Sequence, residues 1–132
     1  MLSTNAQSFR GDYPITTKPR GTLRIICLGD SVTFGYRVPV VWPDKPTEYH
    51  PAWLPYPMLL EKQLRDANLG RRIEVIAMAV PGYTSHQGLA WLRRDIDYLE
   101  PDLVIASFGW NDASFPIERR FGRLGIPLQC AG

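Results

Sequence analysis

Apolar residues follow two alternating patterns along the chain. Three short, nearly continuous apolar runs, rich in β-branched residues, span about residues 22–28, 73–79 and 103–108. Runs of this kind are typical of strands that are buried on both faces of a parallel sheet. Between them lie two longer segments whose apolar residues recur at helical spacing. The resulting order, strand-helix-strand-helix-strand, predicts an α/β protein in which helices cover both faces of a parallel sheet, a three-layer α/β/α architecture.

Both predicted helices have residues that mark where they begin and end. Pro57 suits the first turn of a helix, and Gly70 suits its end. The expected apolar face of this helix holds Leu60, Leu64 and Ala67. In the second helix, Thr84 or Ser85 can serve as the N-cap, and Pro101 marks the end. Its expected core face comprises Leu89, Leu92, Ile96 and Leu99.

The 132 residues suit a single domain that is large enough to bury a core. Residues 1–21 are polar and interrupted by glycine and proline, which predicts an irregular lead-in, and residues 22–132 then form the domain. Residues 37–57 hold six of the twelve prolines and predict a long loop. This loop is either the rim of a ligand site or a flap that packs on the body of the domain.

Composition narrows the partners and the compartment. The net charge of +2 gives no reason to expect a nucleic acid or a membrane surface as a partner. No apolar run approaches the length of a membrane-spanning helix, and the N-terminus lacks the apolar core of a signal peptide, so we expect a soluble protein, cytoplasmic by default. The two cysteines, Cys27 and Cys130, have no metal-ligand spacing. We therefore expect Cys27 to be a core thiol. The sequence implies no metal or organic cofactor.

Polar residues follow each predicted strand directly. Gly29-Asp30-Ser31 follows the first strand, Pro81-Gly82-Tyr83 the second, and Gly109-Trp110-Asn111-Asp112 the third. Because parallel strands all end at the same edge of the sheet, these turns can converge there, where open α/β sheets bind their ligands. For Ser31 the alternative is an ordinary strand-to-helix turn in which its hydroxyl caps the helix.

A hydroxyl, a glycine N–H and a carboxamide at one edge are the parts of an acyl-transfer site. The Ser31 hydroxyl can attack a carbonyl carbon, and the two donors can hold the oxyanion that develops. Gly82 lets an ester approach the backbone closely, and the neutral amide of Asn111 donates hydrogen bonds without attracting a proton.

These residues resemble the sequence blocks of the SGNH hydrolases, also called GDSL-like lipases and esterases. Residues 29–36 match the first block, with Val32 where the name-giving motif has leucine. Gly82 matches the glycine of the second block, and residues 109–112 match the third block, glycine-any-asparagine-aspartate. The resemblance covers about residues 24–112 and implies the flavodoxin-like SGNH hydrolase fold.

The resemblance also implies roles for three residues. Ser31 would be the nucleophile and a backbone oxyanion donor, and the Gly82 N–H and the Asn111 side chain would complete the oxyanion hole. The implied reaction is hydrolysis of a small-molecule carboxylic ester through a serine acyl-enzyme.

The fourth block of the family, Asp-x-x-His, supplies the general base and is missing from this sequence. The histidines are His50 and His86, and neither follows an aspartate by three residues. We therefore expect an N-terminal portion or a shortened homologue of the fold, incomplete at the C-terminus. Such a chain should have little activity by itself, because a serine without a base is a poor nucleophile. A missing flank also leaves a sheet edge uncovered, which favours self-association.

Four residues near the strand ends have structural as well as functional interpretations. Asp30 can accept N–H bonds at the start of a helix, and Asp112 can cap the segment after Asn111. His86 falls at a helix start, where a charged imidazolium is disfavoured, so we interpret it as a rim or structural residue rather than the base. Trp110 is either a pocket wall or part of the core.

Two other classes of function have weaker support from the sequence. A nucleotide-binding module would need Gly-x-x-x-x-Gly-Lys-Ser/Thr or Gly-x-Gly-x-x-Gly, and neither motif is present. A non-catalytic carbohydrate- or acyl-binding remnant of the same fold is the second alternative. It predicts that a ligand is retained without turnover.

Overall fold

The computed structural model describes residue 9, residues 15–35 and residues 54–114 of the chain. Three parallel strands form one sheet: β1 (Thr22–Gly29), β2 (Arg72–Ala79) and β3 (Leu103–Ser107). Their order in the sheet is β2-β1-β3, so the strand that leads to Ser31 is the central one. The predicted parallel sheet is confirmed. The expected proline-rich loop lies largely outside the described residues.

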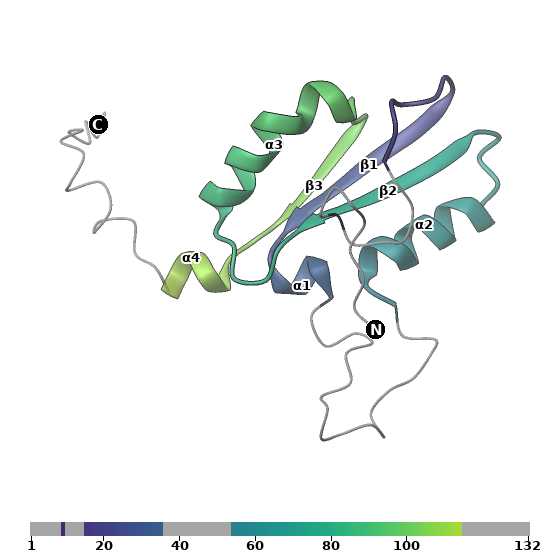
Figure 1. Ribbon diagram of the computed structural model, residues 1–132. Helices are drawn as coiled ribbons and strands as arrows, with labels where there is room; N and C mark the ends of the chain where they lie inside the picture. The colour runs from purple at the N-terminus through teal and green to yellow at the C-terminus, as the bar shows by residue number, and fades with distance from the viewer. Residues whose placement is uncertain (1–8, 10–14, 36–53, 115–132) are drawn as a thin grey trace, which may run out of the picture.

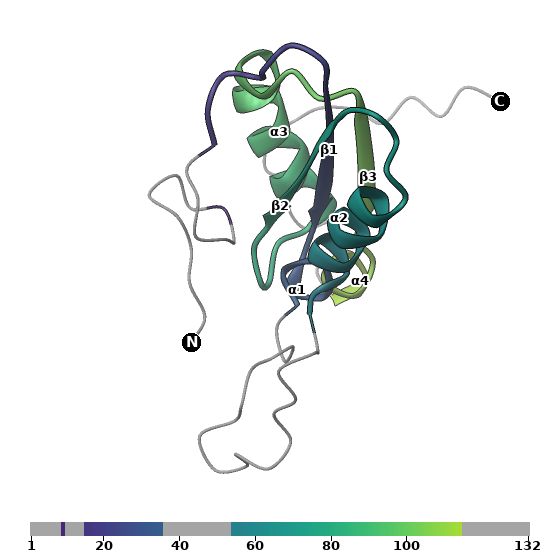
Figure 2. The ribbon, with the colours of Figure 1, turned by 90° about the vertical axis from the view of Figure 1, so that its right-hand side faces the viewer.

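Helices cover both faces of this sheet. The helix α2 (Tyr56–Asp66) joins β1 to β2, and α3 (Ser85–Leu99) joins β2 to β3. They lie on opposite sides of the strands in both ribbon views (Figures 1 and 2), which confirms the three-layer architecture. Two short helices, α1 (Ser31–Phe34) and α4 (Trp110–Ser114), directly follow the ends of β1 and β3. None of the described helices is long and apolar enough to cross a bilayer.

Alternate residues of β1 point into two separate cores. Ile26 and Leu28 pack on the α3 side, and Ile25 and Cys27 pack on the α2 side. Both sets are nearly or completely buried, as expected for a central strand covered on both faces. The α2 side of the core is completed by residues of α2 and its neighbouring strands, namely Tyr56, Leu60, Leu64, Ile73, Val75 and Ile105.

The face of α3 that packs on the sheet differs from the predicted one. Leu92 and Leu99 face the core as expected, but Leu89 is 41% exposed and Ile96 is 38% exposed. The helix is turned about its axis relative to the predicted orientation because Gly88 is buried against the ring of Phe108. A Cβ atom at Gly88 would lie 2.3 Å from the Cζ atom of Phe108. Because Gly88 has no side chain, the ring of Phe108, which directly follows β3, packs closely against α3. Trp91 of α3 packs against the same core.

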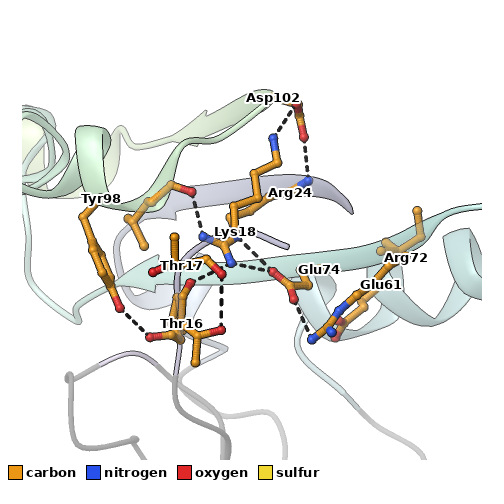
Figure 3. Close-up of polar contacts among 12 residues, drawn as sticks. Thr16, Thr17, Lys18, Arg24, Glu61, Arg72, Glu74, Tyr98 and Asp102 are labelled. Carbon is orange, nitrogen blue, oxygen red and sulfur yellow. Dashed lines mark hydrogen bonds and ion pairs between the residues drawn. The ribbon is translucent and has the colours of Figure 1, made fainter. Parts of the chain in front are cut away.

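A buried ion pair lies at the end of the sheet where the strands begin (Figure 3). Arg24 of β1 is fully buried and lies opposite Glu74 of β2 in the parallel register. Its Nε and Nη2 atoms donate to Glu74 Oε2 at 2.9 and 2.8 Å. The remaining donors reach the carbonyl oxygens of Leu99 and Thr16 at 2.8 and 2.9 Å. The guanidinium thus neutralises a carboxylate and also satisfies the C-terminal end of α3.

The same network attaches the segment that precedes β1. Lys18 forms a 2.6 Å ion pair with Oδ1 of Asp102. The other carboxylate oxygen of Asp102 accepts the backbone N–H of Arg24 at 2.8 Å. These two bonds lower the pKa of the Asp102 carboxyl, the Lys18 bond most of all. Tyr98 donates its hydroxyl proton to the carbonyl oxygen of Ile15 at 2.8 Å. Residues 15–18 therefore contact the domain although they form no regular element.

Candidate active site

The three turns that follow the strands meet at one edge of the sheet. In Figure 1 the strands run toward α1, α4 and the turn that precedes α3, which gather at the same end. Gly29 lies in register with Ala79 of β2 and with Ser107 of β3. Its carbonyl oxygen also accepts the N–H of Val80 at 3.2 Å, so the first two turns separate only beyond this bond.

Ser31 is the first residue of α1, and the cap of this helix is its neighbour Asp30. One carboxylate oxygen of Asp30 accepts the N–H of Val32 at 2.9 Å. This confirms the structural role predicted for Asp30 and excludes the interpretation of Ser31 as the helix cap. Within the described part of the chain, neither the hydroxyl nor the N–H of Ser31 has a hydrogen-bond partner. Both groups of this partly exposed residue are therefore available for another molecule.

Glycines on either side shape the Ser31 turn. A Cβ atom at Gly29 would lie 1.9 Å from Thr33 Oγ1 and 2.7 Å from the carbonyl oxygen of Ser107. Position 29 thus lacks a side chain because α1 folds directly back over the end of β1. Gly35 ends α1 in the left-handed conformation, with φ of 68°. Both glycines therefore relieve steric limits at this turn.

Gly82 is required for its backbone conformation rather than for space. Its φ angle is +86°, which side chains rarely adopt, and nothing lies within 4 Å of the position that a Cβ atom would occupy. The residue is exposed, and among the described residues its N–H has no acceptor. This N–H is therefore an unused donor at the same edge as Ser31.

Asn111 links the second and third turns to the first. Its Nδ2 atom donates to the carbonyl oxygen of Tyr83 at 2.9 Å, and it lies 3.5 Å from Oδ2 of Asp30. Tyr83 follows Gly82 directly, so the carboxamide is bound to the same turn that carries the glycine N–H. The acceptor is a backbone carbonyl oxygen, which every residue type has. This contact therefore could not be predicted from the sequence.

The sequence suggested that Asp112 caps the segment after Asn111, but the structure gives this residue a different contact. It lies within the first turn of α4, and its Oδ1 atom accepts the N–H and the hydroxyl of Ser85 at 2.9 and 3.0 Å. The carboxylate therefore binds the first turn of α3, where negative charge is favourable. The cap of α3 itself is Thr84, which forms a reciprocal capping box with Gln87.

The remaining candidates lie at the surface. His86 is exposed in the first turn of α3, and the side chain of Trp110 is 82% exposed. Trp110 is therefore not a core residue, because α4 projects beyond the end of the sheet instead of packing on it. His50 lies outside the described residues. No three or more histidine, cysteine, aspartate or glutamate side chains in the described segments are grouped so that they could hold a metal ion.

A cluster of neutral polar groups lies beneath the Ser31 turn, and the sequence did not predict it. The hydroxyls of Thr33 and Tyr56 are 3.3 Å apart, and Thr33 is fully buried. Burial raises the pKa of the Cys27 thiol to about 11, against the opposing effect of its hydrogen bond with Tyr56. Burial likewise raises the pKa of Tyr56. The expected core thiol at Cys27 is confirmed, and both groups remain protonated near neutral pH.

Comparison with known proteins bears on the family of the chain. Residues 27–123 match the model of the GDSL-like lipase/acylhydrolase family. The chain is 33% identical over 100 residues to an arylesterase of Vibrio mimicus, across 76% of this chain and 43% of that protein. It thus spans less than half the length of this curated relative.

Solved structures show the same fold. The esterase AlinE4, described as an SGNH-hydrolase family esterase, has a TM-score of 0.50 and 24% identity over 88% of this chain and 58% of its own. A serine-to-alanine variant of that esterase gives a TM-score of 0.51 and 25% identity, covering 87% and 53% of the two chains. The family match extends from the central strand to beyond Asn111 and covers most of the sequence, so this chain belongs to the GDSL-like lipase/acylhydrolase family.

Proposed function

We propose that this chain carries the nucleophile and the oxyanion hole of a serine esterase that acts on small-molecule carboxylic esters. The contact of Asn111 with the carbonyl oxygen of Tyr83 and with Asp30 is the observation that carries the proposal. It connects all three turns at the edge where the Ser31 hydroxyl has no partner among the described residues. Membership of an acylhydrolase family supports the same reaction class.

In the proposed reaction, Oγ of Ser31 forms a bond to the ester carbonyl carbon. The negative charge that develops on the carbonyl oxygen is held by the N–H groups of Ser31 and Gly82 and by Nδ2 of Asn111. The bond to the alcohol oxygen then breaks, and the alcohol leaves with a proton that replaces the one lost from serine. Water next cleaves the acyl-serine, which releases the carboxylic acid and restores the hydroxyl.

We further propose that turnover by this chain alone is slow. The sequence contains no Asp-x-x-His, and His86 is exposed in the first turn of α3. Loss of the base in a serine hydrolase costs on the order of a millionfold in turnover. Acylation of Ser31 then depends on solvent or buffer to accept its proton.

Covalent labelling tests the nucleophile without requiring turnover. The chain is incubated with a small alkyl fluorophosphonate, and the modified residue is identified by peptide mass spectrometry. We expect one adduct, at Ser31, which Ser31→Ala abolishes. Ser114→Ala is the matched control, because this hydroxyl lies on α4 near the same edge and, among the described residues, bonds only to the carbonyl oxygen of Trp110. A folded chain without an adduct, or one labelled equally at other serines, would refute the proposal and favour the non-catalytic alternative.

A second measurement tests the interpretation of His86. Hydrolysis of p-nitrophenyl acetate is a suitable assay, because the curated relative is described as an arylesterase. We expect a low rate that Ser31→Ala removes and His86→Ala leaves unchanged. A large loss in His86→Ala would instead identify this histidine as the base.

A further inference from the structure

Asp30 divides its two carboxylate oxygens between the nucleophile turn and the oxyanion donor. The residue is only 3% exposed, which is unusual for an aspartate. Its Oδ1 atom accepts the N–H of Val32 and caps α1, while Oδ2 faces Nδ2 of Asn111 at 3.5 Å. A helix cap needs only one of these oxygens, so the second requires its own explanation.

The two hydrogens of the Asn111 amide are held unequally. The contact with the Tyr83 carbonyl oxygen, at 2.9 Å, has ordinary hydrogen-bond length, whereas the contact with Asp30 is long and weak. The first bond fixes the amide nitrogen on the turn that contains Gly82 and Tyr83. The second only orients the remaining hydrogen and can be given up at little cost.

We propose that Asp30 is a positioning residue that holds the second hydrogen of Asn111 toward Ser31 until an oxyanion replaces the carboxylate as its acceptor. This inference rests on the proposed function. Asp30 precedes Ser31 directly, and its carboxylate contacts both the first turn of the helix that begins at Ser31 and the amide of Asn111. Fixing a donor before the reaction avoids the cost of orienting it in the transition state.

Two substitutions separate this role from that of a helix cap. Asparagine and serine cap helices about as well as aspartate, so both keep the Val32 contact and the fold. In Asp30→Asn, however, an oxygen that caps Val32 leaves the side-chain NH2 facing the NH2 of Asn111, two donors without an acceptor. In Asp30→Ser the shorter side chain does not reach Asn111. Asp112→Asn is the matched control, since it removes the neighbouring carboxylate, which contacts Ser85 instead.

The first measurement is hydrogen exchange of the Asn111 side-chain amide by NMR on the full chain, with its signals identified by their loss in Asn111→Ala. We expect both Asp30 variants to accelerate exchange of one amide proton by about two- to tenfold, the equivalent of one modest hydrogen bond. The proton bound to Tyr83 should be unaffected, and the control should match the native chain. Unchanged exchange in both variants would reduce Asp30 to a helix cap and overturn the inference.

The second measurement is the rate at which the fluorophosphonate labels Ser31. Removing an oxyanion donor costs about a hundred- to a thousandfold, so misorienting one should cost roughly ten- to a hundredfold in Asp30→Asn. A rate that rises in this variant would mean that the carboxylate opposes the oxyanion, which also overturns the inference. If the native chain is not labelled at all, the proposed function fails, and the exchange measurement alone decides whether Asp30 holds Asn111.

Discussion

The buried ion pair between Arg24 and Glu74 allows a quantitative test of the fold. In Glu74→Leu, the guanidinium keeps its contacts with two carbonyl oxygens but loses the only carboxylate that neutralises it within the described residues. Because Arg24 is 0% exposed, no solvent replaces the lost partner. Removing one member of a buried pair costs about 3–5 kcal/mol, which corresponds to a fall in Tm of roughly 4 °C per kcal/mol for a domain of this size.

The double variant Arg24→Met/Glu74→Leu provides the critical comparison. It removes both charges and fills similar volumes with apolar side chains, a change that is often neutral or stabilising. Here the carbonyl oxygens of Leu99 and Thr16 also lose their donor, at about 1–3 kcal/mol for each one left unsatisfied. We therefore expect the double variant to be more stable than Glu74→Leu, although less stable than the native chain.

Urea unfolding followed by far-ultraviolet circular dichroism measures these free energies. A loss below about 1 kcal/mol in Glu74→Leu would show that the pair is not desolvated. A double variant less stable than Glu74→Leu would equally refute the reasoning, because the second substitution would then add a loss instead of relieving a buried charge.

Further predictions concern the turn, the thiol and the sheet edge. Gly29→Ala should lower the free energy of unfolding by about 1–3 kcal/mol, because the new methyl group overlaps Thr33 Oγ1, and calorimetry should show a lower unfolding temperature. In a Cys130→Ser background, Cys27 should react with a thiol reagent at pH 8 only after denaturation. Unfolding free energy should fall as pH rises from 9.0 towards about 11, because the unfolded thiol ionises first; a flat profile would contradict this. We also expect the chain to self-associate along β3, which is an edge strand among the described residues, so Leu103→Lys, at a 49% exposed position, should increase the monomer fraction in sedimentation velocity.

The order of elements could be predicted from the sequence because each signal is local. The strands are continuous apolar runs, and Thr84 and Pro101 mark the ends of α3 within its own sequence. The core face of α3 could not be predicted in the same way. It depends on Phe108, which comes from another element and fits against Gly88, and no periodicity within the helix reports that contact.

In the candidate site, too, some features could be predicted from the sequence and others could not. The residue types at the strand ends, such as Ser31 and Asn111, predicted the chemistry, since parallel topology brings the turns together. The supporting contacts were missed because their acceptors carry no sequence signal or lie far away in the chain. Tyr83 contributes a backbone carbonyl oxygen, and the Asp112 carboxylate reaches across 27 residues to Ser85.

The central place of β1 in the sheet has a consequence for substitutions far from the site. The serine is carried by the middle strand, whereas the glycine and the carboxamide follow the two strands beside it. Any change in the twist between neighbouring strands therefore alters the spacing between the hydroxyl and one donor while leaving the other in place. Core substitutions under β2 and under β3 should accordingly perturb Gly82 and Asn111 independently, which offers a way to adjust each without altering a residue of the turns.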